Sequence, residues 1–528
     1  ERIDDWQYQP ATGDAQVLQE VRFLRYIPAN AVFSFATGQP YHTILSSGAP
    51  LPAVAGSFMF IQGLQSDAIM MQASSTQAGG IHALRSGGAG GGPLGYAAGG
   101  AKDINNFRDN VKNDYLPIPT DITYEGIFYN YYFRQGQEQE CRELFCPSYS
   151  RAVSKDPLGN ETEHFLTVGL NSNLRKSEFE RKKLNLVLVL DISGSMSTSF
   201  DQYYYDRFGN RHRNTEATGK SKMQVAAESL VALTRHLEKD DRLGVVLFND
   251  QAYKAKPIRL TQDTDMEAIR QHMLELRAGG GTNMASGMRM ASQMLEPYED
   301  VNKSRYENRI IFLTDAMPNI GTRTESGLIH MMEENAEDGI YTTFVGIGVD
   351  FNTKLVDAIT SVRGANYFSV HSSEQFRKRM DTNFKYMVTP LVFNLTLRLE
   401  SDAYRIEKVY GSTAAEEATG EIMKVNTLFP APTKQGRTKG GVVLVQLERT
   451  GQGTRMNLRV TYEKRSGGKG SSSRHIRFGQ HQPPYYENTG IHKAVLLSRY
   501  VNLMKNWVVY ERSQDDSSVD HPPIPGEA

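Results

Sequence analysis

LNLVLVLDISGS, at residues 184–195, begins as an almost continuous apolar run and ends in side chains that carry oxygen. An apolar run of this length predicts a strand that is buried on both faces. Asp191, Ser193 and Ser195 follow directly after it. Carboxylate and hydroxyl oxygens are the ligands that Mg²⁺ or Ca²⁺ prefers. The stretch therefore predicts a buried strand that presents hard oxygen ligands at its carboxyl end.

Residues 182–388 alternate between buried strands and amphipathic helices. This order predicts an α/β domain with a doubly wound, mostly parallel sheet that is covered on both faces. We expect strands at residues 184–190, 243–248, 309–313, 341–347 and 367–370, with an edge strand at 252–260. We expect helices at residues 222–237, 266–276, 285–295, 353–360 and 374–387.

Two more oxygen-bearing side chains follow elements of this domain. Thr282 comes after three glycines at residues 279–281, and Asp315 comes after the strand at 309–313. Ligands of open parallel sheets bind at the carboxyl ends of the strands, near the point where the strand order reverses. We therefore expect these side chains to join the first three at one edge. With two carboxylates and three hydroxyls, a bound Mg²⁺ or Ca²⁺ would stay electrophilic and accept a carboxylate from a partner.

At these five positions the chain resembles the von Willebrand factor type A domain. The metal-ion-dependent adhesion site of that family reads D-x-S-x-S, then a threonine, then an aspartate. The resemblance implies that Ser193, Ser195 and Thr282 ligate one divalent cation, and that Asp191 and Asp315 mainly hold metal-bound waters. It also implies a protein ligand that supplies an acidic residue to the metal.

The chain departs from the family after the D-x-S-x-S motif. The first helix usually follows within a few residues, whereas here residues 197–220 intervene. The insertion contains Tyr203, Tyr204, Tyr205 and Arg207, and tyrosine and arginine are enriched at interface hot spots. Three interpretations stay open: a solvated loop, a recognition loop that binds a partner, and a loop that covers the metal.

The regions on both sides of this domain resemble those of bacterial extracytoplasmic proteins that carry a central type A domain. The resemblance covers about residues 102–510. Six predicted strands without intervening helices indicate a β-sandwich at residues 389–485, which the helical segment and strands of 102–181 join. We expect a C-terminal helix at 486–512 and a disordered tail at 513–528. Residues 1–101 end in a Gly/Ala-rich segment, 79–100, that is expected to be a solvated linker, with an extended arm that packs on a neighbouring subunit as the alternative.

Composition narrows the class of protein. The 528 residues carry 59 basic and 60 acidic side chains, a net charge of −1, which offers no field for nucleic acid. No apolar run reaches the ~20 residues of a membrane-spanning helix. Because the chain begins at Glu1, we expect a processed precursor and an extracytoplasmic location: secreted, periplasmic or on the cell surface. Cys141 and Cys146 form either a disulfide or a pair of free thiols.

These observations predict a non-catalytic adhesion protein that binds protein ligands through a divalent cation. One alternative is a structural subunit of an extracellular or surface assembly, in which other copies of the chain are the partners. Another is an accessory subunit of an ATPase or chelatase complex. An enzyme ranks last, because no general base accompanies the predicted metal ligands.

Overall fold

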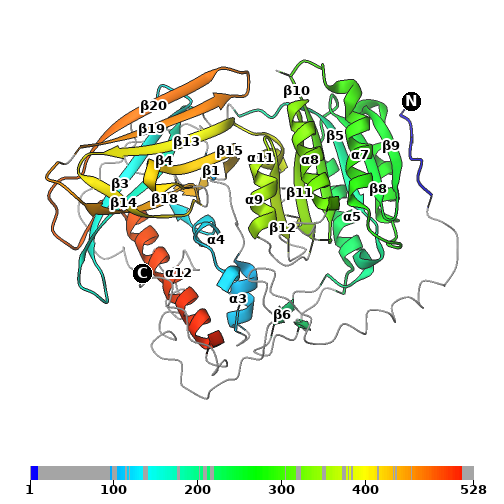
Figure 1. Ribbon diagram of the computed structural model, residues 1–528. Coiled ribbons are helices and arrows are strands. Elements are labelled where there is room, and N and C mark those ends of the chain that lie inside the picture. The colour runs from blue at the N-terminus through cyan, green and yellow to red at the C-terminus, as the bar shows by residue number, and fades with distance from the viewer. Residues whose placement is uncertain are drawn as a thin grey trace, which may run out of the picture.

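The computed structural model describes residues 2–9, 95–97 and, with short gaps, 104–513. An α/β domain and a domain of antiparallel sheets lie side by side (Figure 1). The predicted insertion at Tyr203–Tyr205 is described only as backbone, Arg207 lies outside the described residues, and so does the predicted tail apart from its first residue.

The α/β domain is built on a six-stranded sheet with the order β12-β11-β10-β5-β8-β9. Five strands are parallel and β9 pairs antiparallel with β8 at one edge. Numbered within the domain, this is the doubly wound order 3-2-1-4-5-6, which reverses between β5 and β10. The strands are β5 (Lys183–Asp191), β8 (Arg242–Phe248), β9 (Ala252–Leu260), β10 (Tyr306–Thr314), β11 (Ile340–Ile347) and β12 (Asn366–Val370). The predicted α/β fold is confirmed.

Helices cover both faces of this sheet because successive side chains of β5 point in opposite directions. Leu186 and Leu188 pack in one core cluster with α5 (Lys222–Thr234), α6 (Met266–Leu274) and α11 (Phe384–Val388). Val187 and Val189 pack in another with α7 (Met284–Leu295), α8 (Arg323–Glu337) and α9 (Thr353–Ser361). Every one of these strand side chains is fully buried, which explains the continuous apolar run. Helix α8 was not anticipated from the sequence.

The second domain contains two five-stranded antiparallel sheets that share one apolar core. One has the order β1-β15-β13-β19-β20, and the other β14-β18-β4-β3-β21. Its strands are β1 (Gly95–Ala97), β3 (Phe145–Lys155), β4 (Thr162–Ser172), β13 (Val392–Ser401), β14 (Tyr404–Tyr410), β15 (Glu421–Ala431), β18 (Val443–Arg449), β19 (Arg455–Lys464), β20 (Lys469–Arg477) and β21 (Tyr485–Tyr486). The sequence analysis missed β3. It also placed β1 in a solvated linker, which is wrong for residues 95–97, because they pair with β15.

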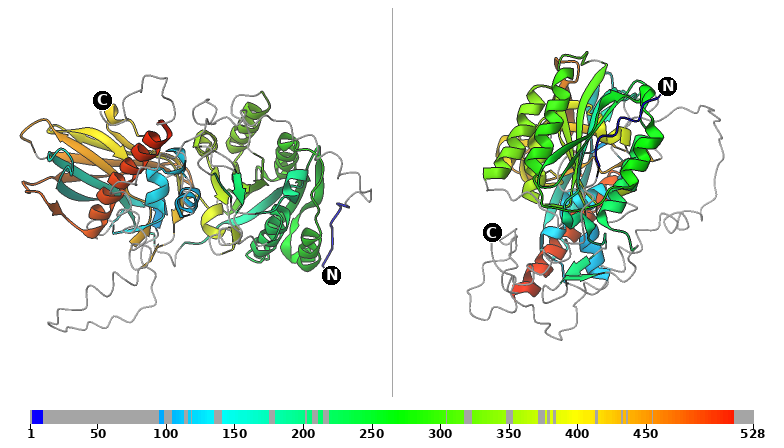
Figure 2. Two further views of the ribbon diagram at one scale, coloured as in Figure 1. Left: turned by 90° about the horizontal axis from the view of Figure 1, so that it is seen from below. Right: turned by 90° about the vertical axis from the view of Figure 1, so that its right-hand side faces the viewer.

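Helices cover the outer face of the second of these sheets (Figure 2). Phe165 of β4 and Leu444 of β18 pack there against Val495 and Val501 of α12 (Thr489–Ser513). Helices α3 (Asn105–Lys112) and α4 (Tyr124–Tyr129) contribute to the same cluster. Within the described part of the chain, no helix is long and apolar enough to cross a membrane.

The α/β domain is inserted between two strands of its neighbour. The chain leaves the antiparallel domain at β4, enters the α/β domain at β5, and returns through α11 to β13. The domains are bonded where they meet: Arg363, which follows α9, donates to both carboxylate oxygens of Glu463 in β19, at 3.0 and 2.8 Å. In the same region the Gly364 N–H donates to Thr427 Oγ1 at 2.7 Å.

The first residues of the chain lie along the edge strand β9. The Gln7 N–H donates to the Ala255 carbonyl at 2.7 Å. The Asp5 carboxylate pairs with Lys256, whose side chain is fully buried, and with Arg259. The sequence contains no signal for this pairing, because the two partners are some 250 residues apart.

Candidate functional site

Two acidic residues follow the neighbouring strands at which the sheet reverses its order. Asp191 is the last residue of β5, and Asp315 comes directly after β10. The strands run parallel in register, with Leu190 opposite Leu313, so both carboxylates reach the same edge. The doubly wound fold thus places the predicted acidic residues at the strand ends where such sheets bind ligands.

Asp191 is fully buried, and each of its carboxylate oxygens accepts a hydrogen bond. The Ser193 N–H donates to one carboxylate oxygen at 2.8 Å, and Thr314 Oγ1 donates to the other at 2.5 Å. Burial raises the pKa of Asp191 to about 6, although the bonds from Ser193 and Thr314 oppose the shift. Asp191 therefore fixes the turn after β5 from inside the domain, rather than facing solvent itself.

The two predicted serines connect to the second carboxylate through one chain of oxygens. Ser193 Oγ lies 3.0 Å from Ser195 Oγ, and Ser195 Oγ donates to Asp315 Oδ1 at 2.7 Å. Ser195 belongs to the short 3-10 turn η5 (Gly194–Ser197), which brings its hydroxyl back over the end of the sheet. Four of the five predicted residues are thus linked, directly or through one another, at a single edge.

Thr282 lies on a loop that is bonded to this edge by its backbone. The Gly279 N–H donates to the Ile192 carbonyl at 2.7 Å, and the Gly194 N–H donates to the Gly280 carbonyl at 2.9 Å. Gly280 has φ +86°, and a Cβ there would lie 2.6 Å from the Asp250 carboxylate, so a glycine is required. The side chain of Thr282 is exposed, and among the described residues its hydroxyl does not join the Ser193–Ser195–Asp315 chain.

A lysine that the sequence analysis did not single out also bonds to a predicted site residue. Lys222 Nζ donates to Asp315 Oδ2 at 2.7 Å, and both side chains are largely buried. Lys222 is the first residue of α5, whose start is fixed by a capping box between Ser221 and Gln224. The insertion separates Lys222 from the serine motif in sequence. The signal that could have identified Lys222 was the predicted helix at residues 222–237, because Lys222 is the first residue of that helix.

The insertion begins and ends at this edge. The Phe200 N–H donates to the Lys220 carbonyl, and the Lys222 N–H donates to the Thr198 carbonyl, both at 2.9 Å. Between these points, β6 (Tyr203–Tyr205) pairs antiparallel with β7 (Arg211–Arg213), and β6 lies beside α3 of the other domain (Figure 1). The hairpin thus extends toward the antiparallel domain. The partner-binding role of its tyrosines stays a prediction.

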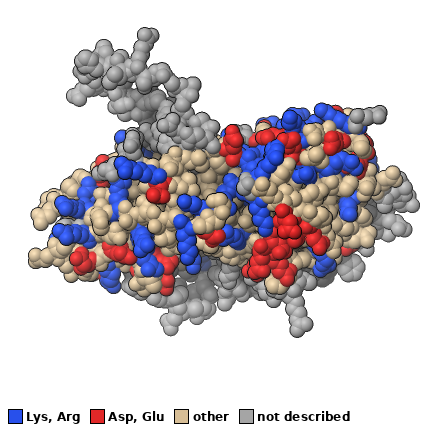
Figure 3. All heavy atoms as spheres, turned by 90° about the horizontal axis from the view of Figure 1, so that it is seen from above, with Lys and Arg blue, Asp and Glu red and all other residues tan. Residues whose placement is uncertain are grey.

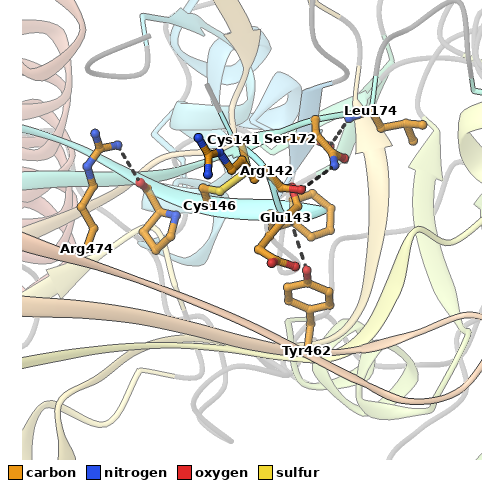
Figure 4. The surroundings of a disulfide bond; sticks show 11 residues. Cys141, Arg142, Glu143, Cys146, Ser172, Leu174, Tyr462 and Arg474 are labelled. Atoms are coloured by element: carbon orange, nitrogen blue, oxygen red, sulfur yellow. Dashed lines mark hydrogen bonds between the residues drawn. A yellow bond between two sulfur atoms is a disulfide. The ribbon is translucent and has the colours of Figure 1, made fainter. Parts of the chain in front are cut away.

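Cys141 and Cys146 form a disulfide in the antiparallel domain, away from the candidate site. Figure 4 shows the bond at the start of β3, where the Phe145 N–H donates to Tyr462 Oη at 3.4 Å across the domain core. The bond closes a short loop against the strand. Of the two alternatives left open by the sequence, the structure contains the disulfide.

Comparison with known proteins agrees with this arrangement. The sequence profile of the von Willebrand factor type A domain matches residues 186–317, which include all five predicted site residues. The chain contains a von Willebrand factor type A domain. The type A profile ends two residues after Asp315, so the antiparallel domain lies outside it.

Two relatives match the chain over part of their length. The chain is 26% identical over 244 residues to inter-alpha-trypsin inhibitor heavy chain H4 of Sus scrofa, covering 46% of this chain and 23% of the relative. The same protein of Bos taurus is 22% identical, covering 42% and 22%. The chain therefore matches less than a quarter of either relative's length. A solved von Willebrand factor type A structure from Catenulispora acidiphila is 15% identical, covers 65% of this chain and 75% of its own, and has a TM-score of 0.37.

Proposed function

We propose that this protein binds a protein partner through one divalent cation, Mg²⁺ or Ca²⁺, held at the carboxyl edge of its type A domain. The presence of that domain indicates a protein-interaction function. The observation that carries the metal proposal is the oxygen chain from Ser193 through Ser195 to Asp315. Its members follow two strands, β5 and β10, that the fold brings together at the reversal point of the sheet.

The spacing of these oxygens suits a small, hard cation. Oxygen ligands of Mg²⁺ lie about 2.0–2.1 Å from the ion in octahedral geometry, so neighbouring ligands are about 3 Å apart. Ser193 Oγ and Ser195 Oγ are 3.0 Å apart. No three acidic, histidine or cysteine side chains gather into a metal cluster among the described residues, so the proposed site depends on hydroxyls.

The donor set explains why such a metal would bind a partner. Ser193, Ser195 and Thr282 would ligate it with neutral hydroxyls, while Asp191 and Asp315 would hold its waters. Neutral ligands leave most of the ionic charge available, so an aspartate or glutamate of the partner can complete the coordination. The carboxylates accept hydrogen bonds from serine, threonine and lysine donors, which favours a binding role over proton transfer.

Lys222 would compete with the cation. Its ammonium group pairs with Asp315 Oδ2, so the charge that a metal would supply at this carboxylate is partly provided by the chain itself. Metal binding would have to act against the ammonium charge or move it away. A lysine in this position is expected to weaken metal affinity.

We place the protein outside the cytoplasm. The disulfide between Cys141 and Cys146 supports this location, because such bonds persist in oxidising compartments. A secreted, periplasmic or surface protein also meets external divalent cations and partners. The identity of the partner is left to experiment.

Titration calorimetry with Mg²⁺, Ca²⁺ and Mn²⁺ tests the proposal. Ser195→Ala should weaken binding of the preferred cation at least about tenfold, because one ligand is lost. Ser197→Ala is the matched control, since Ser197 lies in the same turn and its hydroxyl donates to the Gly194 carbonyl instead of the predicted site. Equal affinities in the wild type and Ser195→Ala, or no binding of any of the three cations, would refute the proposed site.

A further inference from the structure

A small cavity lies at the opposite edge of the α/β sheet, where the two domains meet. Its volume is about 70 Å³, several times the roughly 10–15 Å³ that one water molecule needs. Residues from both domains line it: Lys182, Val301, Lys303, Tyr306, Glu307, Asn308, Gly339, Tyr341, Phe393 and Arg465. Figure 3 shows this face, with basic side chains along the junction and a dense acidic group beside them on the α/β domain.

The charged lining is predominantly cationic. Lys182, Lys303 and Arg465 contribute three positive charges, and Glu307 contributes one negative charge. The lysines come from the segment that enters β5 and from the loop before β10, whereas Arg465 comes from the turn between β19 and β20. The positive charges therefore approach the cavity from different elements and from both domains.

The single carboxylate of the cavity is already neutralised from within the α/β domain. Glu307 Oε1 accepts from Nε and Nη2 of Arg309 at 3.0 and 2.7 Å. Arg309 is completely buried and also donates to Thr343 Oγ1 at 3.0 Å. Arg465 reaches only the other oxygen of Glu307, at 3.4 Å. One carboxylate thus serves two guanidinium groups, and the lysines add further positive charge.

The lysine at the junction is held in unfavourable surroundings. Lys182 Nζ donates to the Lys303 carbonyl, which offers a dipole but no negative charge. Burial, together with the nearby Arg465 charge, lowers the pKa of Lys182 to about 8. Cations that are partly removed from water are stable only when they are paired. Among the described residues that line the cavity, Glu307 is the one carboxylate, and its oxygens already bond to Arg309 and Arg465.

We propose that the cavity binds a small tetrahedral oxyanion, phosphate or sulfate, between Lys182, Lys303 and Arg465. Arginine and lysine are the usual ligands of such anions. A tetrahedral ion presents acceptors in several directions, which suits donors that come from three elements. Because Lys182 and Arg465 belong to different sides of the junction, the bound anion would also connect the two domains.

The acidic group next to the cavity does not supply this charge. Glu296, Glu299, Asp300 and Asp338 cluster beyond Lys303, and burial and the other three raise the pKa of Glu299. These carboxylates lie on the surface, where water and salt screen their charge. They reduce the field at Lys303 more than at Lys182 or Arg465. We therefore assign the main contacts to Lys182 and Arg465.

Calorimetry and thermal unfolding of the full chain, at neutral pH and constant ionic strength, test this proposal with sodium phosphate, sulfate, acetate and chloride. Phosphate or sulfate should bind and raise the unfolding temperature, whereas chloride and acetate should not. Lys182→Met keeps the apolar stem and should weaken oxyanion binding about tenfold or more, because a charge-assisted hydrogen bond is lost. Lys239→Met, at an exposed position of the same domain, is the control.

A parallel titration with O-phosphoserine distinguishes a free ion from the phosphate group of a larger ligand. Binding of either form that depends on Lys182 supports the site. The proposal is overturned if no oxyanion binds, if acetate binds as well as phosphate, or if Lys182→Met and Lys239→Met bind equally.

Because Lys182→Met could alter the junction, Arg465→Lys provides a second variant that keeps the charge. It should bind more weakly than wild type but still measurably.

Discussion

The α/β sheet carries opposite charges at the two ends of its strands, which are called its carboxyl edge and its amino edge. At the carboxyl edge, buried Asp191 and Asp315 are surrounded by hydroxyls, and Lys222 is the cation bonded to them. At the amino edge, buried Glu307 is surrounded by Arg309 and Arg465. The loops at the first edge include the insertion at residues 197–220. At the second edge, Phe393 and Arg465 of the antiparallel domain help to line the cavity.

The difference indicates what each edge requires. Under the two proposals, hydroxyl groups let the carboxyl edge accept a cation, and a surplus of guanidinium and ammonium groups lets the amino edge accept an anion. We propose that charge at the carboxyl edge serves binding, because it lies at the strand ends where ligands of this fold bind. Charge at the amino edge serves the junction between domains, because it is buried and paired across elements.

The largest expected effect is at the amino edge. Glu307→Gln removes the carboxylate that neutralises fully buried Arg309, and we expect the free energy of unfolding to fall by about 3–5 kcal/mol. Urea denaturation measures this change. Glu299→Gln, at a partly exposed neighbouring position, should stay within about 0.5 kcal/mol of wild type. Similar stabilities for the two variants would show that the buried pair at the amino edge is not structurally required.

An intermediate effect is expected at the carboxyl edge. Asp191→Asn keeps the size of the side chain but removes its charge from the turn that carries Ser193. We expect affinity for Mg²⁺ or Mn²⁺ to fall about 10–100-fold, as for other residues that orient metal ligands. Calorimetry measures the affinity, and circular dichroism verifies that the variant is folded. An unchanged affinity in a folded variant would remove Asp191 from the site.

The smallest effect is expected for Lys222, the lysine that pairs with Asp315 at the carboxyl edge. Lys222→Met removes the ammonium that pairs with Asp315, so we expect metal affinity to rise about tenfold, a gain of roughly 1.4 kcal/mol. Without metal, the same variant should be less stable than wild type, because a buried carboxylate loses its partner. Lys220→Met is the control, since the Lys220–Glu228 pair is about half exposed and such pairs contribute about 0–1 kcal/mol. Weaker metal binding by Lys222→Met would show that the lysine supports the site instead of competing for it.

Much of the carboxyl edge could be predicted from the sequence because its signals are local. The apolar run before Asp191 and the strand before Asp315 fix where the two carboxylates emerge, and the parallel order then brings them together. The strands at 243–248 and 341–347 were likewise located within one residue of their observed bounds. Buried parallel strands have an almost continuous apolar pattern, which few other structures share.

The amino edge could not be predicted, because its residues are far apart in sequence and give no local signal. Lys182, Lys303 and Arg465 lie in connections or turns, far apart in sequence, and only the packing of two domains brings them to one cavity. Arg309 was expected to begin a strand, whereas it lies inside β10 and is completely buried. The pairing of β1 with β15 was hidden in a glycine-rich segment that lacks any strand pattern.

Crystals grown with Mn²⁺ provide the most direct test of the metal site, because anomalous scattering locates the ion without reference to any mutation. We predict a peak about 2.0–2.3 Å from Ser193 Oγ and Ser195 Oγ, as expected for a hard cation with oxygen ligands. The Lys222 ammonium should then no longer contact Asp315. A crystal with saturating Mn²⁺ that shows no peak at this edge, with Lys222 still paired to Asp315, would contradict the central claim.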